Sequence, residues 1–231
     1  MSEPSAAPRR AIVSGTSYGI GRAIAERLLR DGWSVIGLDR AERSIDHPMF
    51  EAETIDLSDV DALRRRVQTM SAPDALVHAA GHMRIGRLGG IDVADGLAMW
   101  ETHVGAATVL ADAFVPRMRD GGRIVLIGSR TASGAAGRSQ YAAVKAALVG
   151  LARSWAIELA PRGITVNVVA PAATDTPLLH DPQRAGSAPK TPPIGRFVKP
   201  EEVAALTAFL LSPEAAAITG QQIVICGGSS L

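Results

Sequence analysis

Tyr141 and Lys145 carry the clearest chemical signal in this sequence. They bound the segment YAAVK, and residues four apart in a helix project from the same face. A tyrosine with a pKa of about 10 is a weak base, and lowering that pKa to roughly 7 requires about 4 kcal/mol of preference for the phenolate. A unit positive charge about 4 Å away supplies a similar amount at an effective dielectric of about 20. The pair could therefore pass a proton to or from an alcohol oxygen.

Ser129 adds a third polar group suited to the same chemistry. It stands 12 residues before Tyr141 and directly follows the apolar segment RIVLIG. The carboxyl ends of parallel strands are where open α/β sheets bind ligands, and a hydroxyl there can hold a substrate oxygen as charge develops on it. Tyrosine and lysine at this spacing also occur as an ordinary surface pair. The three residues in this order favour catalysis.

A glycine-rich turn near the N-terminus indicates a dinucleotide site. The glycines permit a tight turn, a close approach of the backbone to a pyrophosphate, and close packing of helix on strand. The following helix would offer its free N–H groups to the phosphates. Three glycines alone could mark only a tight turn, but a strand precedes them and a helix follows. The residues predicted to bind the cofactor here are Gly15, Thr16, Ser17, Tyr18, Gly19, Ile20 and Gly21.

Asp39 and Arg40 follow the second apolar segment, where the adenosine ribose would lie. A carboxylate at this point accepts hydrogen bonds from the ribose hydroxyls and repels a 2′-phosphate. Asp39 could instead only cap a turn, and Arg40 could pair with a 2′-phosphate. Residues 16–18 contain no second base to assist Arg40. The sequence therefore favours NAD over NADP.

These residues are spaced among short apolar runs that alternate with helical patterns. The runs are continuous, which indicates strands buried on both faces of a parallel sheet. Strands are predicted over 10–14, 33–38, 53–56, 75–78, 123–127, 164–169 and 222–225, and helices over 20–30, 59–70, 93–118, 139–160 and 201–211. In the long helix, Leu97 and Trp100 share a helical spacing with Val104, Ala107, Leu110 and Phe114. The pattern is typical of an α/β, Rossmann-type doubly wound fold.

No linker or repeat suggests a second unit, so residues 1–231 are predicted to form a single domain. Residues 1–8 are expected to be a disordered lead-in. Residues 175–200 break the alternation, with five prolines from Pro177 to Pro193, and are expected to form a substrate loop or lid.

Bulk composition narrows the function classes. The formal net charge is +1, which implies neither nucleic acid nor an anionic membrane as a partner. No apolar run is long enough for a membrane span, and the N-terminus lacks the apolar core of a secretory signal. Cys226 is the single cysteine, which fits a reducing compartment. A soluble, cytoplasmic protein is expected, and no metal site is predicted.

Taken together, these motifs resemble the short-chain dehydrogenase/reductase family. The matching segments span nearly the whole chain: the Gly15–Gly21 turn, Asp56-Leu57, Ala79-Ala80-Gly81, Ser129, Tyr141 with Lys145, 167–171 with Thr176-Pro177, Thr219-Gly220-Gln221 and Gly227-Gly228. The resemblance implies strand order 3-2-1-4-5-6-7, a bound NAD(P), and a homotetramer or homodimer.

The resemblance also implies individual roles. Tyr141 would be the general acid/base, Lys145 would bind the nicotinamide ribose and lower the tyrosine pKa, and Ser129 would orient the substrate. The remaining predicted cofactor contacts are Asp56 and Leu57 at the adenine, Ala80 and Gly81 near the adenosine ribose and Thr176 at the carboxamide, together with Tyr141, Pro171 and Thr174.

His103 departs from the family pattern, which usually has an asparagine there that holds a water in the proton relay from the lysine. A neutral imidazole could take over that task because it has one donor and one acceptor. On this hypothesis His103 lies on the inward face beneath Lys145, and activity falls on acidification through the histidine range. His103 could equally be a packing residue.

The substrate is less well indicated. Arg84, Arg130, Arg138 and His180 flank segments that would close over the nicotinamide, and they could bind a carboxylate, although each could also be a solvated loop charge. The segments GHMRIG, ATDTP and CGGSSL resemble the dihydrodihydroxybenzoate dehydrogenase branch of the family. We therefore expect a small cyclic or carboxylated secondary alcohol as substrate. The alternatives are an NAD(H)-binding sensor of the same fold and a lyase or epimerase that uses bound NAD.

Overall fold

The computed structural model describes residues 7–180 and 189–231. Residues 1–6 of the predicted lead-in and residues 181–188 of the predicted lid lie outside the described residues. Seven parallel strands form one sheet in the order β3-β2-β1-β4-β5-β6-β7, as predicted. The strands are β1 (Arg10–Ser14), β2 (Ser34–Asp39), β3 (Phe50–Thr54), β4 (Ala75–His78), β5 (Arg123–Ile127), β6 (Thr165–Pro171) and β7 (Gln222–Ile225).

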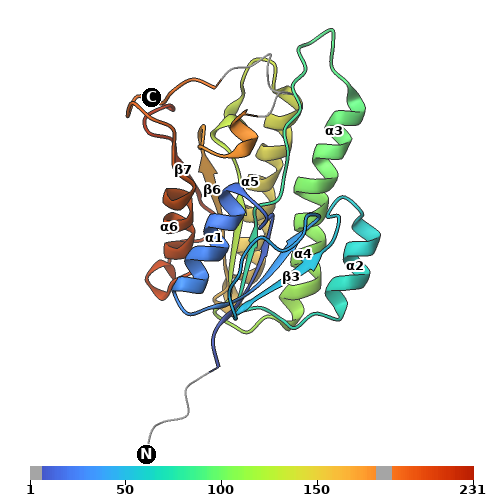
Figure 1. The fold of residues 1–231 in the computed structure, drawn as a ribbon, viewed down its shortest axis with the longest axis vertical. Coiled ribbons are helices and arrows are strands. Elements are labelled where there is room, and N and C mark those ends of the chain that lie inside the picture. Colours follow the sequence, from blue (N-terminus) through green and yellow to red (C-terminus); the bar gives the residue numbers. More distant parts are fainter. Residues whose placement is uncertain (1–6, 181–188) are drawn as a thin grey trace, which may run out of the picture.

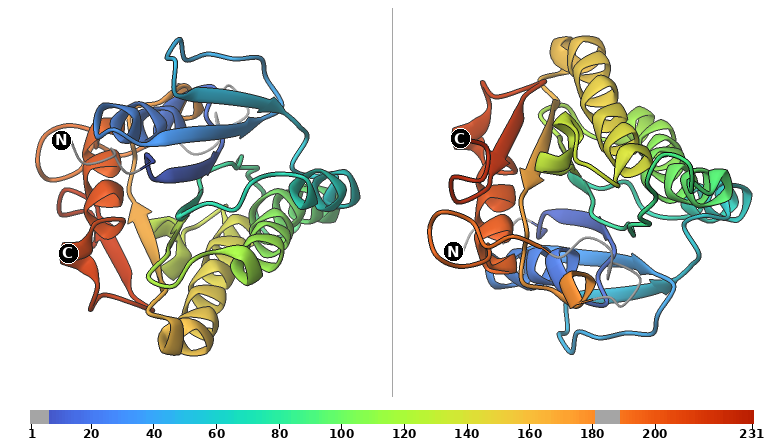
Figure 2. Two further views of the ribbon diagram at one scale, coloured as in Figure 1. Left: turned by 90° about the horizontal axis from the view of Figure 1, so that it is seen from below. Right: turned by 90° about the horizontal axis from the view of Figure 1, so that it is seen from above.

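Helices cover both faces of this sheet (Figures 1 and 2). The helices are α1 (Gly19–Arg30), α2 (Val60–Gln68), α3 (Val93–Trp100), α4 (Ala106–Phe114), α5 (Ser139–Leu159) and α6 (Pro200–Leu210). Helices α2, α4 and α5 pack with Ile12 and Leu38 in one core cluster. Helices α1 and α6 pack with Ala11 and Val13 in the other. Neighbouring residues of β1 thus enter opposite cores, which explains why its apolar run is continuous.

The strand predicted over 53–56 is wrong in position. β3 begins at Phe50 and ends at Thr54, with Phe50 opposite Val35 of β2. It is an edge strand in which Glu51 and Glu53 alternate with less polar residues, so it lacks the continuous apolar run on which the other strands were recognised. The other strand and helix predictions differ from the structure by two residues or fewer at each end, apart from the long helix over 93–118.

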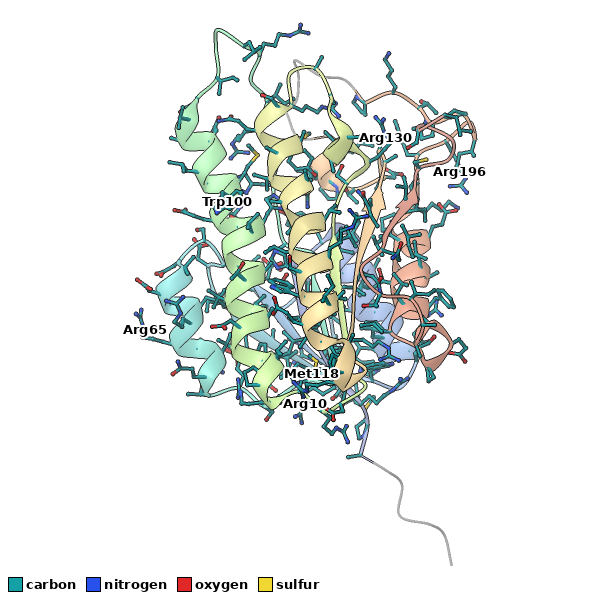
Figure 3. All side chains as sticks on the ribbon, turned by 180° about the vertical axis from the view of Figure 1, so that it is seen from behind. Arg10, Arg65, Trp100, Met118, Arg130 and Arg196 are labelled. Carbon is teal, nitrogen blue, oxygen red and sulfur yellow. The ribbon has the colours of Figure 1, made fainter. Side chains whose placement is uncertain are left out.

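The long helix is interrupted. A π-helical turn, η1 (Glu101–Gly105), separates α3 from α4, and a 3-10 turn, η2 (Val115–Arg117), ends the segment. A π turn shifts the facing of the residues on its two sides, so one helical spacing does not continue through it. Leu97 is 61% exposed and Trp100 is 48% exposed, whereas Val104 and Phe114 are buried. Figure 3 shows Trp100 on the outer side of this helix, so it does not share a buried face with Val104 and Phe114 as the single helical spacing suggested.

The carboxyl ends of the parallel strands meet at one edge of the sheet. Figure 3 shows the two ends of the molecule, with Arg10 at the start of β1 and Arg130 at the opposite end, just past β5. That second end therefore receives the glycine turn, Asp39, the Ala79–Gly81 segment, Ser129 and the segment after β6. Among the described residues, no helix is long and apolar enough to cross a membrane.

Candidate active site

The glycine turn after β1 is shaped by close backbone contacts. Gly15 has φ +78°, and a Cβ there would lie 2.8 Å from the backbone of Ala80. A Cβ on Gly21 would lie 2.1 Å from the carbonyl oxygen of Gly15. Helix α1 begins at Gly19, and its N-cap residue Tyr18 makes no side-chain cap hydrogen bond. The first N–H groups of α1 are thus left for another acceptor, as a phosphate-binding turn requires.

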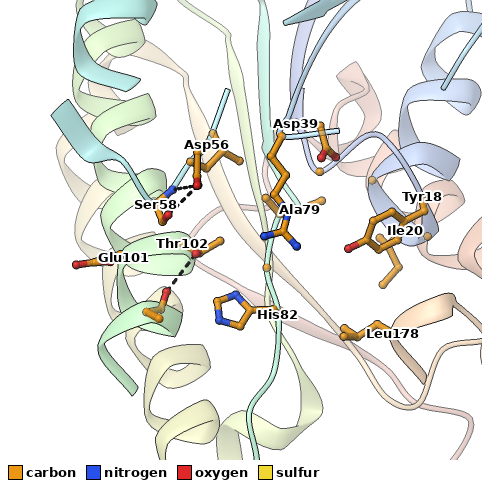
Figure 4. Close-up of a pocket in the computed structure, with 18 of the residues that line it drawn as sticks. Tyr18, Ile20, Asp39, Asp56, Ser58, Ala79, His82, Glu101, Thr102 and Leu178 are labelled. Atoms are coloured by element: carbon orange, nitrogen blue, oxygen red, sulfur yellow. Dashed lines mark hydrogen bonds between the residues drawn. The ribbon is translucent and has the colours of Figure 1, made fainter. Parts of the chain in front are cut away.

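This turn borders a cavity of about 580 Å³, here named the glycine-loop cavity. Figure 4 shows Asp56 and Ser58 on one side of it and Tyr18 and Ile20 on the other. The predicted cofactor residues that line it are Gly15, Tyr18, Gly19, Ile20, Gly21, Asp39, Arg40, Asp56, Leu57, Ala80, Gly81 and Thr176. Thr16 and Ser17 are not among its lining residues. Thr16 is buried, and the backbone N–H of Ser17 donates to Asp39.

Asp39 both supports the turn and faces the glycine-loop cavity. Its Oδ2 accepts a hydrogen bond from the Ser17 backbone N–H at 2.9 Å, and its Oδ1 accepts one from the Ala41 N–H at 3.1 Å. A carboxylate oxygen has a second lone pair, so each can still accept a ribose hydroxyl. The turn-capping and cofactor-binding interpretations of Asp39 are therefore compatible.

Asp56 is held across the cavity from the glycine turn. Its Oδ1 accepts hydrogen bonds from the Ser58 hydroxyl at 2.7 Å and the Ser58 N–H at 2.9 Å. These bonds are the main reason that the pKa of Asp56 lies below its ordinary value, and the nearby Arg40 charge acts in the same direction. The carboxylate is thus fixed and ionised at the cavity wall.

A second cavity of about 620 Å³, here named the catalytic cavity, contains all four predicted catalytic residues. Ser129, Tyr141, Lys145 and His103 line it, together with Pro171 and Thr174 from the predicted cofactor set. It shares Ile20, Ala79, Gly81, His82, Thr176 and Leu178 with the glycine-loop cavity, so the two adjoin. A ligand extended along this edge of the sheet can reach both.

Ser129 is positioned by the chain direction after β5. It is the N-cap of a 3-10 turn, η3 (Arg130–Ser133), and its Oγ accepts the Thr131 N–H at 3.1 Å. The hydroxyl is buried at the cavity wall and its hydrogen remains free to donate. A hydroxyl held in this way is suited to donating to a substrate oxygen.

Tyr141 and Lys145 lie in the first two turns of α5. The Lys145 Nζ lies 5.7 Å from the centre of the Tyr141 ring and donates a hydrogen bond to the Ile127 carbonyl at 2.7 Å. Burial lowers the pKa of Lys145 to about 7. At neutral pH the protonated and neutral forms of the lysine are therefore close in free energy. In the protein without its cofactor, desolvation of the ammonium thus opposes the positive charge expected beside the tyrosine.

His103 lies in the π turn and packs directly on Gly81, where a Cβ would lie 1.9 Å from its Cε1. Its Nε2 is 2.8 Å from the carbonyl oxygen and 3.1 Å from the amide nitrogen of His82, so it can satisfy one of these two groups. Its ring meets the Tyr141 ring edge-on, with centres 5.9 Å apart. His103 thus fixes the segment that follows β4.

The predicted titration of His103 in the ordinary histidine range is wrong. Burial, with a further contribution from the Lys145 charge, holds its pKa well below the ordinary value. The buried imidazole therefore favours its neutral form. Its Nδ1 is buried and has no hydrogen-bond partner among the described residues. The hypothesis that this nitrogen holds a relay water remains a prediction.

A buried network around His78 was not anticipated. The Ser14 Oγ and the His78 Nδ1 are 2.8 Å apart, and the same Oγ accepts the N–H groups of Ala79 and Ala80 at 3.0 and 3.1 Å. Burial is the main cause that lowers the pKa of His78 to about 3. Ser14 and His78 end the neighbouring strands β1 and β4 and are paired in register, a signal that the strand assignments already contained. The network holds the glycine turn against the Ala79–Gly81 segment.

The four candidate substrate residues do not all lie at the same cavity. Arg130 and Arg138 line the catalytic cavity. Arg84 instead lines the adjoining glycine-loop cavity and lies 3.7 Å from Asp95, so its role toward the substrate stays a prediction. The side chain of His180 lies outside the described residues. His82, Met83, Thr131 and Leu179 also line the catalytic cavity and were not predicted, since they belong to irregular segments and short turns.

Comparison with known proteins agrees with this geometry. A family model described as enoyl-(acyl carrier protein) reductase matches residues 15–230. The chain is 36% identical to the 3-oxoacyl-[acyl-carrier-protein] reductase FabG of Vibrio harveyi, over 94% of this chain and 96% of that protein.

Two solved structures are similar in fold. A short chain dehydrogenase family protein from Francisella tularensis superposes with a TM-score of 0.89 at 26% identity, covering 97% of this chain and 99% of that one. The structure of BdcA in complex with NADPH superposes with a TM-score of 0.85 at 34% identity, covering 95% and 93%. With its Rossmann-type sheet and glycine turn, the chain belongs to the short-chain dehydrogenase/reductase family of NAD(P)-binding oxidoreductases.

Proposed function

We propose that this protein is an NAD-dependent oxidoreductase that interconverts a secondary alcohol and a ketone, with Tyr141 as the general acid/base. One observation carries the proposal. Ser129, Tyr141 and Lys145 come from two different elements and line one cavity, which adjoins the cavity formed by the glycine turn. Neither a binding module nor a structural protein needs these three groups around one space.

The residues of the glycine-loop cavity fit a dinucleotide. Because Gly15 and Gly21 carry no Cβ, the turn can keep its close-packed shape, and the uncapped start of α1 would hold the pyrophosphate. The carboxylates of Asp39 and Asp56 would hold the adenosine end. Thr174 and Thr176 would hold the nicotinamide end, since both line the catalytic cavity. When bound, the dinucleotide supplies or accepts the hydride.

The residues of the catalytic cavity would manage the proton. In the oxidative direction the Tyr141 phenolate takes the proton of the substrate hydroxyl, while the hydrogen on the same carbon leaves as hydride. The Ser129 hydroxyl donates to the substrate oxygen and keeps it beside the phenol. Lys145, when protonated, favours the phenolate, and its partial deprotonation at neutral pH lets it relay a proton. In the reductive direction Tyr141 returns the proton to the oxygen.

We further propose that NAD(H) is preferred over NADP(H). Asp39 ends β2 at the wall of the glycine-loop cavity, where its charge would repel a 2′-phosphate. BdcA was solved with NADPH, so the fold itself does not decide the matter. Arg40, which lines the same cavity, is the group that would favour the phosphate.

The proposed substrate is a small cyclic or carboxylated alcohol. A second candidate is the reduction of a 3-oxoacyl group, because the FabG relatives are named for that activity and share 36% identity with this chain. Both are ketone–alcohol conversions, so the same catalytic residues serve either. We also infer a homo-oligomer, a tetramer or a dimer, since Val93, Leu97 and Trp100 expose an apolar strip on α3. A cytoplasmic location is inferred separately, from the single cysteine, Cys226.

A turnover screen tests this function. The purified protein is incubated with NAD and panels of cyclic alcohols, hydroxy acids and sugar alcohols, and in the reverse direction with NADH and 3-oxoacyl thioesters. NADH absorbance is followed, with the Tyr141→Phe variant as the blank. We expect release or consumption of free NADH with at least one panel. Tight NADH binding with no turnover in any panel would favour the sensor interpretation instead.

A further inference from the structure

The walls of the two cavities differ in charge. The glycine-loop cavity is lined by three acidic side chains (Asp39, Asp56 and Glu101) and two arginines (Arg40 and Arg84). The catalytic cavity is lined by Arg130, Arg138 and Lys190 in addition to Lys145, and by no aspartate or glutamate side chain among the described residues. Among the residues that the structure describes, the charged side chains of the catalytic cavity are therefore all basic, and the proton chemistry proposed above uses only Lys145.

Arg130 and Arg138 are placed beside the reacting groups by the chain itself. Arg130 directly follows Ser129 and begins the turn η3. Arg138 is the N-cap residue of α5, one turn before Tyr141. Both side chains are half-buried, and Arg130 makes no ion pair with any described residue. The guanidinium groups thus approach the catalytic cavity from the two segments that also carry the serine and the tyrosine.

The two arginines are close enough to influence each other. Burial lowers the pKa of Arg138, the negative charge of an ionised Tyr141 raises it, and the positive charge of Arg130 makes a smaller contribution that lowers it. Two like charges that are partly withdrawn from water repel each other, and an anion between them removes that repulsion. Guanidinium groups are well suited to this because they bind a carboxylate through two parallel hydrogen bonds.

We propose that Arg130 and Arg138 form a carboxylate-binding pair in the catalytic cavity, so that the substrate is a compact hydroxy acid or oxo acid. This rests on the proposed function and narrows its substrate class. Because the arginines flank Ser129 and Tyr141 in the chain, the carboxylate lies near the carbon that bears the reacting oxygen. A long acyl chain on a carrier would place its anionic group far from this pair.

The test uses a matched pair of probes that need no turnover. Cyclohexanecarboxylate and cyclohexanecarboxamide have similar shapes and differ in charge. Each is titrated into the complex of the protein with NADH, and the fluorescence of the bound nicotinamide is followed. We expect the carboxylate to bind at least about tenfold more tightly than the amide, a difference of about 1.4 kcal/mol.

Variants of the two arginines test whether they cause the preference for the carboxylate. Arg130→Gln and Arg138→Gln should each reduce the preference for the carboxylate, and the double variant should bring the ratio close to one. Arg65→Gln is the matched control, because Arg65 is exposed on α2 and lines neither cavity. It should leave the ratio unchanged. Unchanged NADH affinity in all variants would show that they remain folded.

Three outcomes would overturn the proposal. One is equal affinity of the wild type for the two probes, and another is an unchanged ratio in the double variant. The third is tighter competition by inorganic phosphate than by the carboxylate, which would assign the pair to a phosphate. Because the probes report binding alone, failure of the turnover screen with a preserved carboxylate preference would reject the proposed reaction without rejecting this pair.

Discussion

The two cavities at the carboxyl edge of the sheet are built in different ways. The glycine-loop cavity is shaped by close backbone packing. A Cβ on Gly15 would lie 2.8 Å from the backbone of Ala80, and a Cβ on Gly21 would lie 2.1 Å from the carbonyl oxygen of Gly15. The catalytic cavity depends on side chains from separate segments, among them His103, Ser129 and Tyr141. A backbone-defined site tolerates few changes of residue, whereas a side-chain-defined site can change its substrate through single substitutions. A backbone-defined site therefore suits a cofactor that related proteins have in common, and a side-chain-defined site suits a substrate that differs between them.

We expect the largest effect, a loss of NADH affinity, from a substitution that adds a Cβ to the glycine turn. Gly15→Ala places a methyl group 2.8 Å from the backbone of Ala80 at a φ of +78°, so the turn must move away from the Ala79–Gly81 segment. We expect NADH affinity to fall by at least about 100-fold, which corresponds to about 2.7 kcal/mol. Fluorescence titration of NADH measures this loss.

Gly32→Ala is the matched control for that substitution. Gly32 has a similar φ of +81°, but no atom lies within 4 Å of the position that a Cβ would take. The change should cost roughly 1–2 kcal/mol of stability from backbone strain and leave NADH affinity unaltered. If both variants lost affinity equally, backbone strain rather than clearance would define the cofactor site.

A smaller effect is expected from the charge at the end of β2. The wild type should bind NADH at least about tenfold more tightly than NADPH, or about 1.4 kcal/mol. Asp39→Asn removes the repulsion of a 2′-phosphate while keeping an oxygen for the Ser17 N–H, so it should narrow the gap. Asp39→Ala should also narrow the difference in affinity between NADH and NADPH. It should weaken the binding of both cofactors, because the Ser17 and Ala41 N–H groups lose their acceptors. Equal binding of both cofactors by the wild type would show that Asp39 does not face the ribose.

The smallest expected effect concerns His103 and appears in stability rather than in activity. Its pKa in the folded protein is well below 6.5, so on acidification the unfolded chain takes up a proton that the folded protein does not. Stability should therefore fall as the pH drops below about 6.5, the ordinary histidine value.

His103→Asn should make that loss smaller, since its amide does not titrate and can bond to both the N–H and the carbonyl of His82. Thermal unfolding of the two proteins at a series of pH values measures the difference, and His78 contributes equally to both. A wild-type activity profile with its own step at the ordinary histidine pKa would contradict the buried, neutral imidazole.

The success of sequence-based prediction follows the same division between the cavities. The glycine turn and the edge that carries the site were predictable, because glycine spacing and continuous apolar strands are visible within a few residues of sequence. The strand order followed from the family resemblance and not from these local patterns. The place of Arg84 was not predictable, since it follows β4 in an irregular segment with no periodicity to orient it. The π turn at Glu101–Gly105 was missed because an apolar helical spacing does not reveal one widened turn. The contact of His103 with His82 joins residues 21 apart, which local patterns do not report.

The central claim is that the cofactor site and the proton-transferring group are separable. Tyr141→Phe tests it most directly, because it removes one hydroxyl from the catalytic cavity and leaves the lining of the glycine-loop cavity intact. NADH affinity and turnover are measured on the same preparation with the best substrate from the screen. We predict NADH affinity within a few fold of wild type and turnover reduced by at least about 100-fold, as expected for the loss of a general acid/base. Turnover close to that of the wild type would contradict the assignment of Tyr141.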